Sequence, residues 1–323
     1  MVGTGPRLYG PARDEPVATA GDIGDKAVPK TILFLDEMPD LGERLARAKI
    51  LYTDLDGTLL GRGACLLKDG EGAPSLDAAT AAVELNRAGL KVSICSGRNA
   101  RQLMEVSRML GWDDFISELG AVRRYREGAR KVYDTGDWPD GVCLAGETPY
   151  EAIIRVGALD ALRESFPGLI EYHDPWHLDR EVTHVLRGNV PLAGAQAVLD
   201  ALPLPVTLVD NGIIHPPKHT LVGVIEVHAF HLVPTGIGKQ HAIAADLAER
   251  GLERDQAIAI GDSAADLAMA DAVGLMVVVR NGLDDPVLRA GLGARPDGDI
   301  VATRAAFGSG WRQLAEAWLS ARC

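Results

Sequence analysis

The sequence predicts an α/β protein in which a doubly wound parallel sheet carries an inserted α+β domain. In the first and last parts of the chain, short apolar segments alternate with segments of helical spacing. Several of the apolar segments end directly on polar or acidic turns, as strands do at the ligand-binding edge of such sheets. The middle of the chain differs, because strand-like and helical pieces there are separated by Pro and Gly.

Bulk properties exclude several classes of function. The chain has 323 residues, a formal net charge of −12 and four cysteines without a CxxC pair. This charge argues against binding to nucleic acid or acidic membranes, although a local cation can still attract an anionic substrate. There is no secretory signal and no apolar run approaching ~18 residues, so we expect a cytoplasmic protein that spans no membrane. The oligomeric state stays open.

Regular elements begin after a lead-in. Residues 1–30 are rich in Gly, Pro, Ala and Asp and predict a flexible segment, and residues 31–49 offer a strand or helix that docks on the body. The following residues predict strands over 50–53, 91–95 and 115–117 and helices over 76–88 and 100–111. This is the alternation of a parallel sheet with helices on both faces.

The inserted region predicts strands over 180–186, 206–209 and 222–227 and helices over 150–165 and 192–201. The first pattern then returns, with helices over 238–250, 266–270 and 310–321 and strands over 256–260 and 276–279. We therefore predict a core in two parts, 31–120 and 235–323, around an α+β domain at 121–234.

An acidic turn, Asp54-Leu55-Asp56-Gly57-Thr58, follows the first strand of the core. Two carboxylates one residue apart repel each other unless a cation joins them, and Mg²⁺ readily bridges carboxylate and phosphate. The alternative is an ordinary acidic turn closed by glycine.

Two further turns offer groups that could hold phosphate. Ser96-Gly97 follows the second strand and supplies a hydroxyl and an amide, while Ser96 could equally be a helix N-cap. Arg98 comes next and is a further phosphate-binding candidate, or else half of a surface ion pair. Lys239 opens a helix after Gly236-Ile237-Gly238 and could neutralise a phosphoryl group, or else be solvated.

A second acidic turn closes the pattern. Residues 257–260 form an apolar strand that ends on Gly261-Asp262-Ser263-Ala264-Ala265-Asp266. Asp262 is suited to bind a metal. Asp266 could orient Lys239 or a metal-bound water, or could simply be an acidic residue in the first turn of a helix.

Together, in this order, the four segments resemble the four motifs of the haloacid dehalogenase-like superfamily. The likeness covers roughly 48–120 and 235–319, and it implies a Rossmann-like core. The insert is similar to the α/β cap of the branch containing Cof-like sugar phosphatases, sucrose-phosphate phosphatase and mannosyl-3-phosphoglycerate phosphatase. The resemblance implies a Mg²⁺-dependent phosphatase, and we expect a phosphorylated small metabolite, such as the phosphate monoester of a sugar or polyol, as its substrate.

The family's mechanism carries over to matching positions. Asp54 would attack phosphorus and become an aspartyl phosphate, and Asp56 would act as general acid and base. Asp54, the Asp56 backbone carbonyl and Asp262 would bind Mg²⁺. Ser96 and Lys239 would hold the phosphoryl oxygens, with help from backbone amides near Leu55 and Gly97.

Ala265 is a departure from the family pattern. Relatives of the branch usually have Asn there, so one polar contact to phosphate or water is missing. Two alternatives stay open: a phosphomannomutase-like phosphotransferase, and a regulatory or binding protein with weak turnover. A dehalogenase is the weakest candidate, because that chemistry needs no magnesium and those relatives generally lack the second Asp.

Histidines gather in the insert. His173, His177, His184, His215 and His219 lie there, with Trp176 and Arg180 near the first two. Their spacing matches no metal motif, and for each histidine alone a structural role is the simpler explanation. As a group, residues 173–180 are our candidate for sugar contacts.

Overall fold

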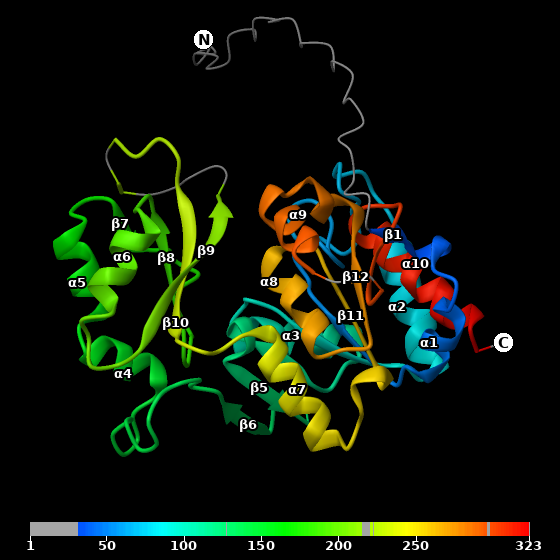
Figure 1. Ribbon diagram of the computed structural model, residues 1–323, viewed down its shortest axis with the longest axis horizontal. Coiled ribbons are helices and arrows are strands. Elements are labelled where there is room, and N and C mark those ends of the chain that lie inside the picture. The colour runs from blue at the N-terminus through cyan, green and yellow to red at the C-terminus, as the bar shows by residue number, and fades with distance from the viewer. Residues whose placement is uncertain (1–31, 127, 215–219, 222, 296–297, 323) are drawn as a thin grey trace, which may run out of the picture.

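The computed structural model describes residues 32–126, 128–214, 220–221, 223–295 and 298–322, and two sheets organise them into two lobes (Figure 1). The larger sheet contains, in spatial order, β1 (Leu33–Phe34), β13 (Ile300–Ala302), β12 (Leu275–Val278), β11 (Ala257–Gly261), β2 (Ile50–Thr53), β3 (Lys91–Cys95), β4 (Phe115–Ser117), β5 (Val122–Tyr125) and β6 (Arg130–Tyr133). Pairing is parallel from β1 to β4 and antiparallel from β4 to β6. The predicted α/β class is confirmed.

Helices cover both faces of this sheet. One face packs against α1 (Leu41–Arg47), α2 (Asp77–Ala88), α3 (Ala100–Leu110) and α10 (Phe307–Ser320). The other packs against α7 (Lys239–Arg250), α8 (Ala264–Leu267) and α9 (Pro286–Gly293). Central strand β2 serves both cores, because Leu51 packs on the first side while Ile50 and Tyr52 pack on the second.

Local sequence explains where these helices begin and end. The α3 N-cap is Asn99, whose side chain accepts a hydrogen bond from the Gln102 amide, as in a capping box. Helices α2 and α3 end at Gly89 and Gly111, both left-handed at φ 78° and 73°. Short 3₁₀ helices complete the connections at Leu35–Glu37, Glu118–Gly120, Arg254–Gln256, Ala268–Asp271 and Arg280–Asp284.

The smaller lobe is built on an antiparallel sheet with the order β7 (Ile170–Tyr172), β8 (His184–Gly188), β10 (His228–Pro234) and β9 (Val206–Ile213). Three helices accompany it: α4 (Pro149–Arg155), α5 (Ala158–Ser165) and α6 (Leu192–Leu199). In Figure 1, α5 and α6 lie on the side of this sheet away from the larger lobe. Phe230 and Leu232 belong to the core on that side, so the alternate residues of β10 point the other way.

Several predicted elements differ from the structure. The strand expected over 180–186 begins only at His184, and the helix expected over 266–270 is divided between α8 and a 3₁₀ helix. The helix expected over 150–165 is two helices, because Gly157 takes a left-handed φ of 73° between them. The strand expected over 222–227 is wrong: residues 223–227 are irregular, Gly223 is left-handed at φ 82°, and the strand begins at His228.

The predicted domain boundaries stay a prediction. Residues 121–234 were assigned to the insert, and β5 and β6 within that range pair with β4 as an edge of the larger sheet. The lead-in predicted over 1–30 lies outside the described residues. Within the part of the chain that the structure describes, no helix has the length and apolarity needed to cross a membrane.

Candidate active site

Three parallel strands of the larger sheet deliver the predicted site residues to one edge. Strand β2 pairs with β3 on one side and β11 on the other, with Thr53 opposite Ile94 and Ile260. The residues that follow are therefore neighbours: Asp54 after β2, Ser96 after β3 and Asp262 after β11. This is the carboxyl edge at which parallel sheets bind ligands.

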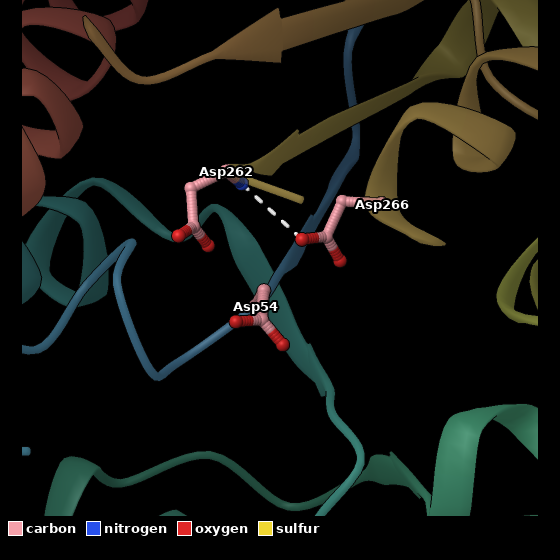
Figure 2. Close-up of side chains that lie close together, drawn as sticks. All are labelled: Asp54, Asp262 and Asp266. Carbon is pink, nitrogen blue, oxygen red and sulfur yellow. Dashed lines mark hydrogen bonds between the residues drawn. The ribbon is translucent and has the colours of Figure 1, made fainter. Parts of the chain in front are cut away.

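Three carboxylates converge at this edge. Asp54, Asp262 and Asp266 each offer an oxygen, and the three oxygens lie within 4.8 Å of one another (Figure 2). Asp54 and Asp266 are only 6% and 1% exposed. Such closely spaced buried carboxylates require compensation by a cation or by hydrogen bonds.

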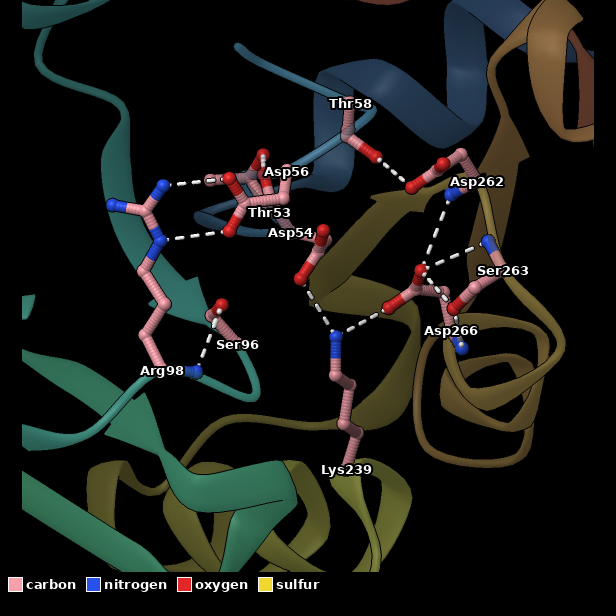
Figure 3. A network of polar contacts seen from close by, with 10 residues as sticks. All are labelled: Thr53, Asp54, Asp56, Thr58, Ser96, Arg98, Lys239, Asp262, Ser263 and Asp266. Atoms are coloured by element: carbon pink, nitrogen blue, oxygen red, sulfur yellow. Dashed lines mark hydrogen bonds and ion pairs between the residues drawn. The ribbon is translucent and has the colours of Figure 1, made fainter. Parts of the chain in front are cut away.

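Lys239 provides part of that compensation from the first turn of α7. Its Nζ lies 2.8 Å from Asp54 Oδ1 and 2.5 Å from Asp266 Oδ1 (Figure 3). Burial opposes the charged lysine, but Asp266 and Asp54 outweigh it, so the pKa of Lys239 is raised well above its usual range. Lys239 is therefore a permanent cation between two carboxylates.

Asp266 has its hydrogen-bonding capacity used within the protein. Its Oδ2 accepts from the Asp262 amide at 3.2 Å, the Ser263 amide at 3.0 Å and Ser263 Oγ at 2.6 Å, while Oδ1 accepts from Lys239. The same Ser263 hydroxyl caps α8. Asp266 is thus arranged to fix Lys239 and the turn that carries Asp262.

The negative charges of Asp54 and Asp262 are not fully compensated by the surrounding protein. Burial, followed by Asp266, raises the pKa of Asp262 to about 7, and burial raises the pKa of Asp54 despite Lys239. Thr58 Oγ1 donates to Asp262 at 2.9 Å, which leaves carboxylate oxygens of Asp54 and Asp262 facing each other. Hard oxygen donors short of positive charge fit a magnesium ion.

Asp56 lies apart from this cluster. Its two oxygens accept from Arg98 Nε at 2.7 Å and Nη2 at 2.6 Å, a bidentate pair at the rim of the site (Figure 3). The Asp56 side chain is 48% exposed. The sequence identified both residues as candidates but gave no sign that they pair.

Ser96 and Gly97 form the wall next to Asp54. Ser96 is 2% exposed, and its Oγ accepts a weak hydrogen bond from the Arg98 amide at 3.4 Å. Gly97 is closely flanked, since a Cβ there would lie 3.3 Å from Leu119 and 3.4 Å from His231. Its carbonyl accepts from Arg180 at 2.9 Å, which links the two lobes.

A cavity of about 540 Å³ lies between the lobes at this point. We call its larger-lobe side the core wall, which comprises Asp54, Asp56, Ala64, Ser96, Gly97, Arg98, Gln102, Leu119, Lys239, Asp262, Ser263 and Ala265. We call its smaller-lobe side the cap wall, which comprises His173, Trp176, Arg180, Val185, Asn211, Ile214, Ala229 and His231.

The sequence located only part of the cap wall. His173, Trp176 and Arg180 come from the predicted segment, whereas His177 stacks on Tyr172 with ring centroids 4.5 Å apart. His184 is buried against the Tyr150 carbonyl, and His215 and His219 lie outside the described residues. His231 was missed as a lining residue; its alternation with Phe230 on β10 is the signal that could have found it.

A family model, haloacid dehalogenase-like hydrolase, matches residues 51–134 and 220–290. The chain belongs to this family. The matched segments contain Asp54, Asp56, Ser96, Lys239 and Asp262, and the match supports the phosphatase class expected from the sequence.

Two relatives of this chain are phosphoglycolate phosphatases. The chain is 27% identical to a phosphoglycolate phosphatase of Methanoculleus marisnigri over 72% of this chain and 84% of that protein. It is 26% identical to phosphoglycolate phosphatase 1 of Saccharolobus solfataricus over 73% and 85%.

Several solved structures share the fold. A Thermoplasma acidophilum protein superposes with a TM-score of 0.56 and 16% identity, covering 84% of this chain and 98% of that one. The sucrose-phosphatase of Synechocystis, solved with sucrose and phosphate, gives 0.55 and 15% over 84% and 98%. At these identities the likeness concerns the architecture, which agrees with the branch that the motifs indicated.

Proposed function

We propose that this protein is a Mg²⁺-dependent phosphatase that hydrolyses the phosphate monoester of a sugar or related polyol through an aspartyl phosphate on Asp54. One observation supports the proposal most directly: Asp54, Asp262 and Lys239 come from distant parts of the chain and lie together in the lining of the cavity. The volume of this cavity, about 540 Å³, suits a small phosphorylated metabolite. The cytoplasmic location expected from the sequence remains a prediction.

The chain's own residues account for both steps. An Asp54 oxygen attacks phosphorus, the ester P–O bond breaks, and Asp56 gives its proton to the departing alcohol oxygen. In the second step Asp56 takes a proton from water, the water oxygen attacks phosphorus, and the Asp54 carboxylate leaves. Phosphate oxygens would contact Ser96, the Gly97 amide and Lys239.

Arg98 takes part in this mechanism because its guanidinium is paired with the Asp56 carboxylate in this structure. A phosphate group offers Arg98 an alternative bidentate partner. When Arg98 exchanges the carboxylate for phosphate oxygens as substrate binds, Asp56 becomes free to take up a proton from solvent and then to give it to the departing alcohol oxygen. Before that exchange both Asp56 oxygens accept hydrogen bonds from Arg98, at 2.6 and 2.7 Å.

Magnesium would be held by Asp54, Asp262 and the Asp56 backbone carbonyl. It would supply positive charge at the transferring phosphoryl group. The raised pKa values of Asp54 and Asp262, both due first to burial, support a cation between them. Asp266 is hydrogen-bonded to the protein on both oxygens, which supports its role in orienting Lys239 rather than binding the ion.

The deciding experiment compares the wild type with Asp54→Asn. We expect Mg²⁺-dependent release of inorganic phosphate from p-nitrophenyl phosphate and from a panel of sugar and polyol phosphates, and a loss of at least about 1,000-fold in the variant. EDTA should abolish the activity. Undiminished turnover in Asp54→Asn contradicts the nucleophile assignment, and an isomerised sugar phosphate without phosphate release indicates the mutase.

A further inference from the structure

The two walls of the cavity carry opposite electrostatic character. On the core wall the carboxylates of Asp54, Asp56 and Asp262 outnumber the cations Lys239 and Arg98, whereas the cap wall contains Arg180 and two histidines and no carboxylate among the described residues. A substrate whose phosphate lies at Asp54 must point its other end toward the cap wall. That end is therefore exposed to a basic environment.

Arg180 is a cation without a bound acidic partner. Its guanidinium donates to three neutral oxygens: the Trp176 carbonyl at 3.1 Å, Thr183 Oγ1 at 2.8 Å and the Gly97 carbonyl at 2.9 Å. No carboxylate of the described residues lies within ion-pair distance of it. Since a guanidinium has five N–H groups, one on each terminal nitrogen remains for a ligand.

Glu118 fixes the backbone that follows Arg180. The Glu118 carboxylate, which is fully buried, accepts from the amides of Glu181 and Thr183 at 2.9 and 2.8 Å and from Thr183 Oγ1 at 2.9 Å. Thr183 in turn accepts from Arg180. The negative charge therefore fixes the backbone beside Arg180 but does not occupy the guanidinium.

Two histidines beside Arg180 have unused donors or acceptors. The Nδ1 atoms of His173 and His231 are both buried and have no hydrogen-bond partner among the residues that the structure describes. His231 is 5% exposed, and its ring lies against Gly97. Burial, followed by nearby arginines, lowers the pKa of His173 to about 4, so this imidazole is neutral at physiological pH.

We propose that Arg180, with His173 and His231, binds a carboxylate on the leaving group, so that the preferred substrates are phosphate monoesters of hydroxy acids or sugar acids. This inference rests on the proposed function and narrows its sugar or polyol to one bearing a carboxylate. A planar carboxylate matches the two free N–H groups. Only one of the three groups carries a formal charge, which balances a monoanion better than a second phosphate.

The test uses substrates that differ only in this group. Phosphoglycolate is compared with 2-hydroxyethyl phosphate, and gluconate 6-phosphate with glucitol 6-phosphate. A charge-assisted contact to Arg180 predicts a kcat/KM at least about 10-fold higher for the acid in one or both pairs, chiefly through KM. Arg180→Met should bring the ratio close to one. His173→Phe, which leaves the guanidinium contacts intact, should lower it by about 3-fold.

Arg101→Gln is the matched control. Arg101 pairs with Asp179, next to Arg180, but is 74% exposed and does not line the cavity. Its removal should leave the acid preference unchanged. Calorimetric binding of both members of each pair to Asp54→Asn measures the same preference without turnover.

The outcomes separate the two proposals. Hydrolysis of p-nitrophenyl phosphate with equal kcat/KM and equal binding for acid and neutral partners overturns the carboxylate inference and leaves the phosphatase intact. An equal loss for both partners in Arg180→Met, with no change of ratio in His173→Phe, overturns it as well. Tighter binding of the acid to a protein that hydrolyses no phosphate ester supports the inference and contradicts the proposed function.

Discussion

The core wall and the cap wall of the cavity differ in charge: the core wall has an excess of carboxylates and the cap wall an excess of basic groups. At the core wall, carboxylates outnumber the cation among them: Asp54, Asp262 and the adjacent Asp266 lie together, and Lys239 contacts only Asp54 and Asp266. On the cap wall, Arg180 lies beside two histidines with unpartnered Nδ1 atoms. This difference supports the two proposals made above, in which a metal cation binds at the core wall and an anionic group of the substrate binds at the cap wall.

The strongest way to break the comparison is to remove the core wall's cation. Lys239→Met leaves Asp54 and Asp266 buried without their partner, so the free energy of unfolding should fall by about 3–5 kcal/mol without metal. Because Lys239 would also contact the reacting phosphate in the proposed mechanism, kcat/KM should fall at least about 1,000-fold. Urea denaturation and phosphate release measure the two effects.

Lys131→Met serves as the control for Lys239. Lys131 pairs with Glu181 at 3.1 Å and is 40% exposed, so its loss should cost at most about 1 kcal/mol. Added Mg²⁺ should recover more stability in Lys239→Met than in the wild type, because binding to the folded state contributes stability. Equal recovery in both proteins contradicts a cation deficit at this wall.

The second prediction concerns the joint between the walls. Glu118→Gln places an amide NH₂ against backbone N–H groups that the carboxylate now satisfies, so we expect a loss of about 2 kcal/mol in the free energy of unfolding. Glu118 acts through residues 181–183, so KM for an acidic substrate should rise while kcat changes little. Denaturation and steady-state kinetics measure these effects.

Glu105→Gln provides the comparison for Glu118. Glu105 is 58% exposed and pairs with Arg108 within α3. Its loss should leave stability and KM unchanged. A rise in KM for acidic and neutral substrates alike in Glu118→Gln indicates general disorder of the cap rather than repositioning of Arg180.

The third prediction uses two histidines of the smaller lobe whose pKa values move in opposite directions. Burial lowers the pKa of His184 to about 4, whereas Asp210 and Glu226 outweigh burial and raise the pKa of His228. Between about pH 6.5 and pH 4 the unfolded chain binds a proton at His184 that the folded protein does not. The free energy of unfolding therefore decreases as the pH falls through this range.

Urea denaturation at pH 7 and pH 5 measures this difference. Relative to His184→Gln, the wild type should lose about 2 kcal/mol of stability between these values. For His228 the sign reverses: the charged histidine stabilises the folded state at low pH, and this contribution is lost as the pH rises through its raised pKa. The same sign for both histidines contradicts the assigned environments.

The sequence predicted more residues of the core wall than of the cap wall, because the two walls are built differently. Core-wall residues follow strand ends, and parallel strands gather their carboxyl ends at one edge whatever the details of packing. Asp54, Ser96 and Asp262 could therefore be placed together from their strand ends, whereas Lys239 begins α7 and was placed there only by its motif. The Arg98–Asp56 pair could not, because it joins side chains 42 positions apart through rotamers that the motifs do not specify.

The cap wall was less predictable because it depends on long-range register. Strand β10 presents His231 to the cavity only because Phe230 and Leu232 pack toward α5 and α6. The sequence shows the alternation but not which face is covered. Likewise, Arg180 lines the cavity because Glu118 binds the three residues that follow it, a contact 63 to 65 positions distant.

The smallest expected effect tests the position where the core wall departs from the family pattern. Ala265 lines the cavity beside Asp262 and Ser263. Ala265→Asn would add an amide donor toward the phosphate, and one neutral hydrogen bond of about 1 kcal/mol corresponds to a roughly 5-fold higher kcat/KM. Ala264→Asn carries the same helix-propensity cost within α8 but does not line the cavity, so it should leave kcat/KM unchanged. An equal change of kcat/KM in both variants would mean that the effect comes from the helix. It would contradict the idea that a polar contact is missing at position 265.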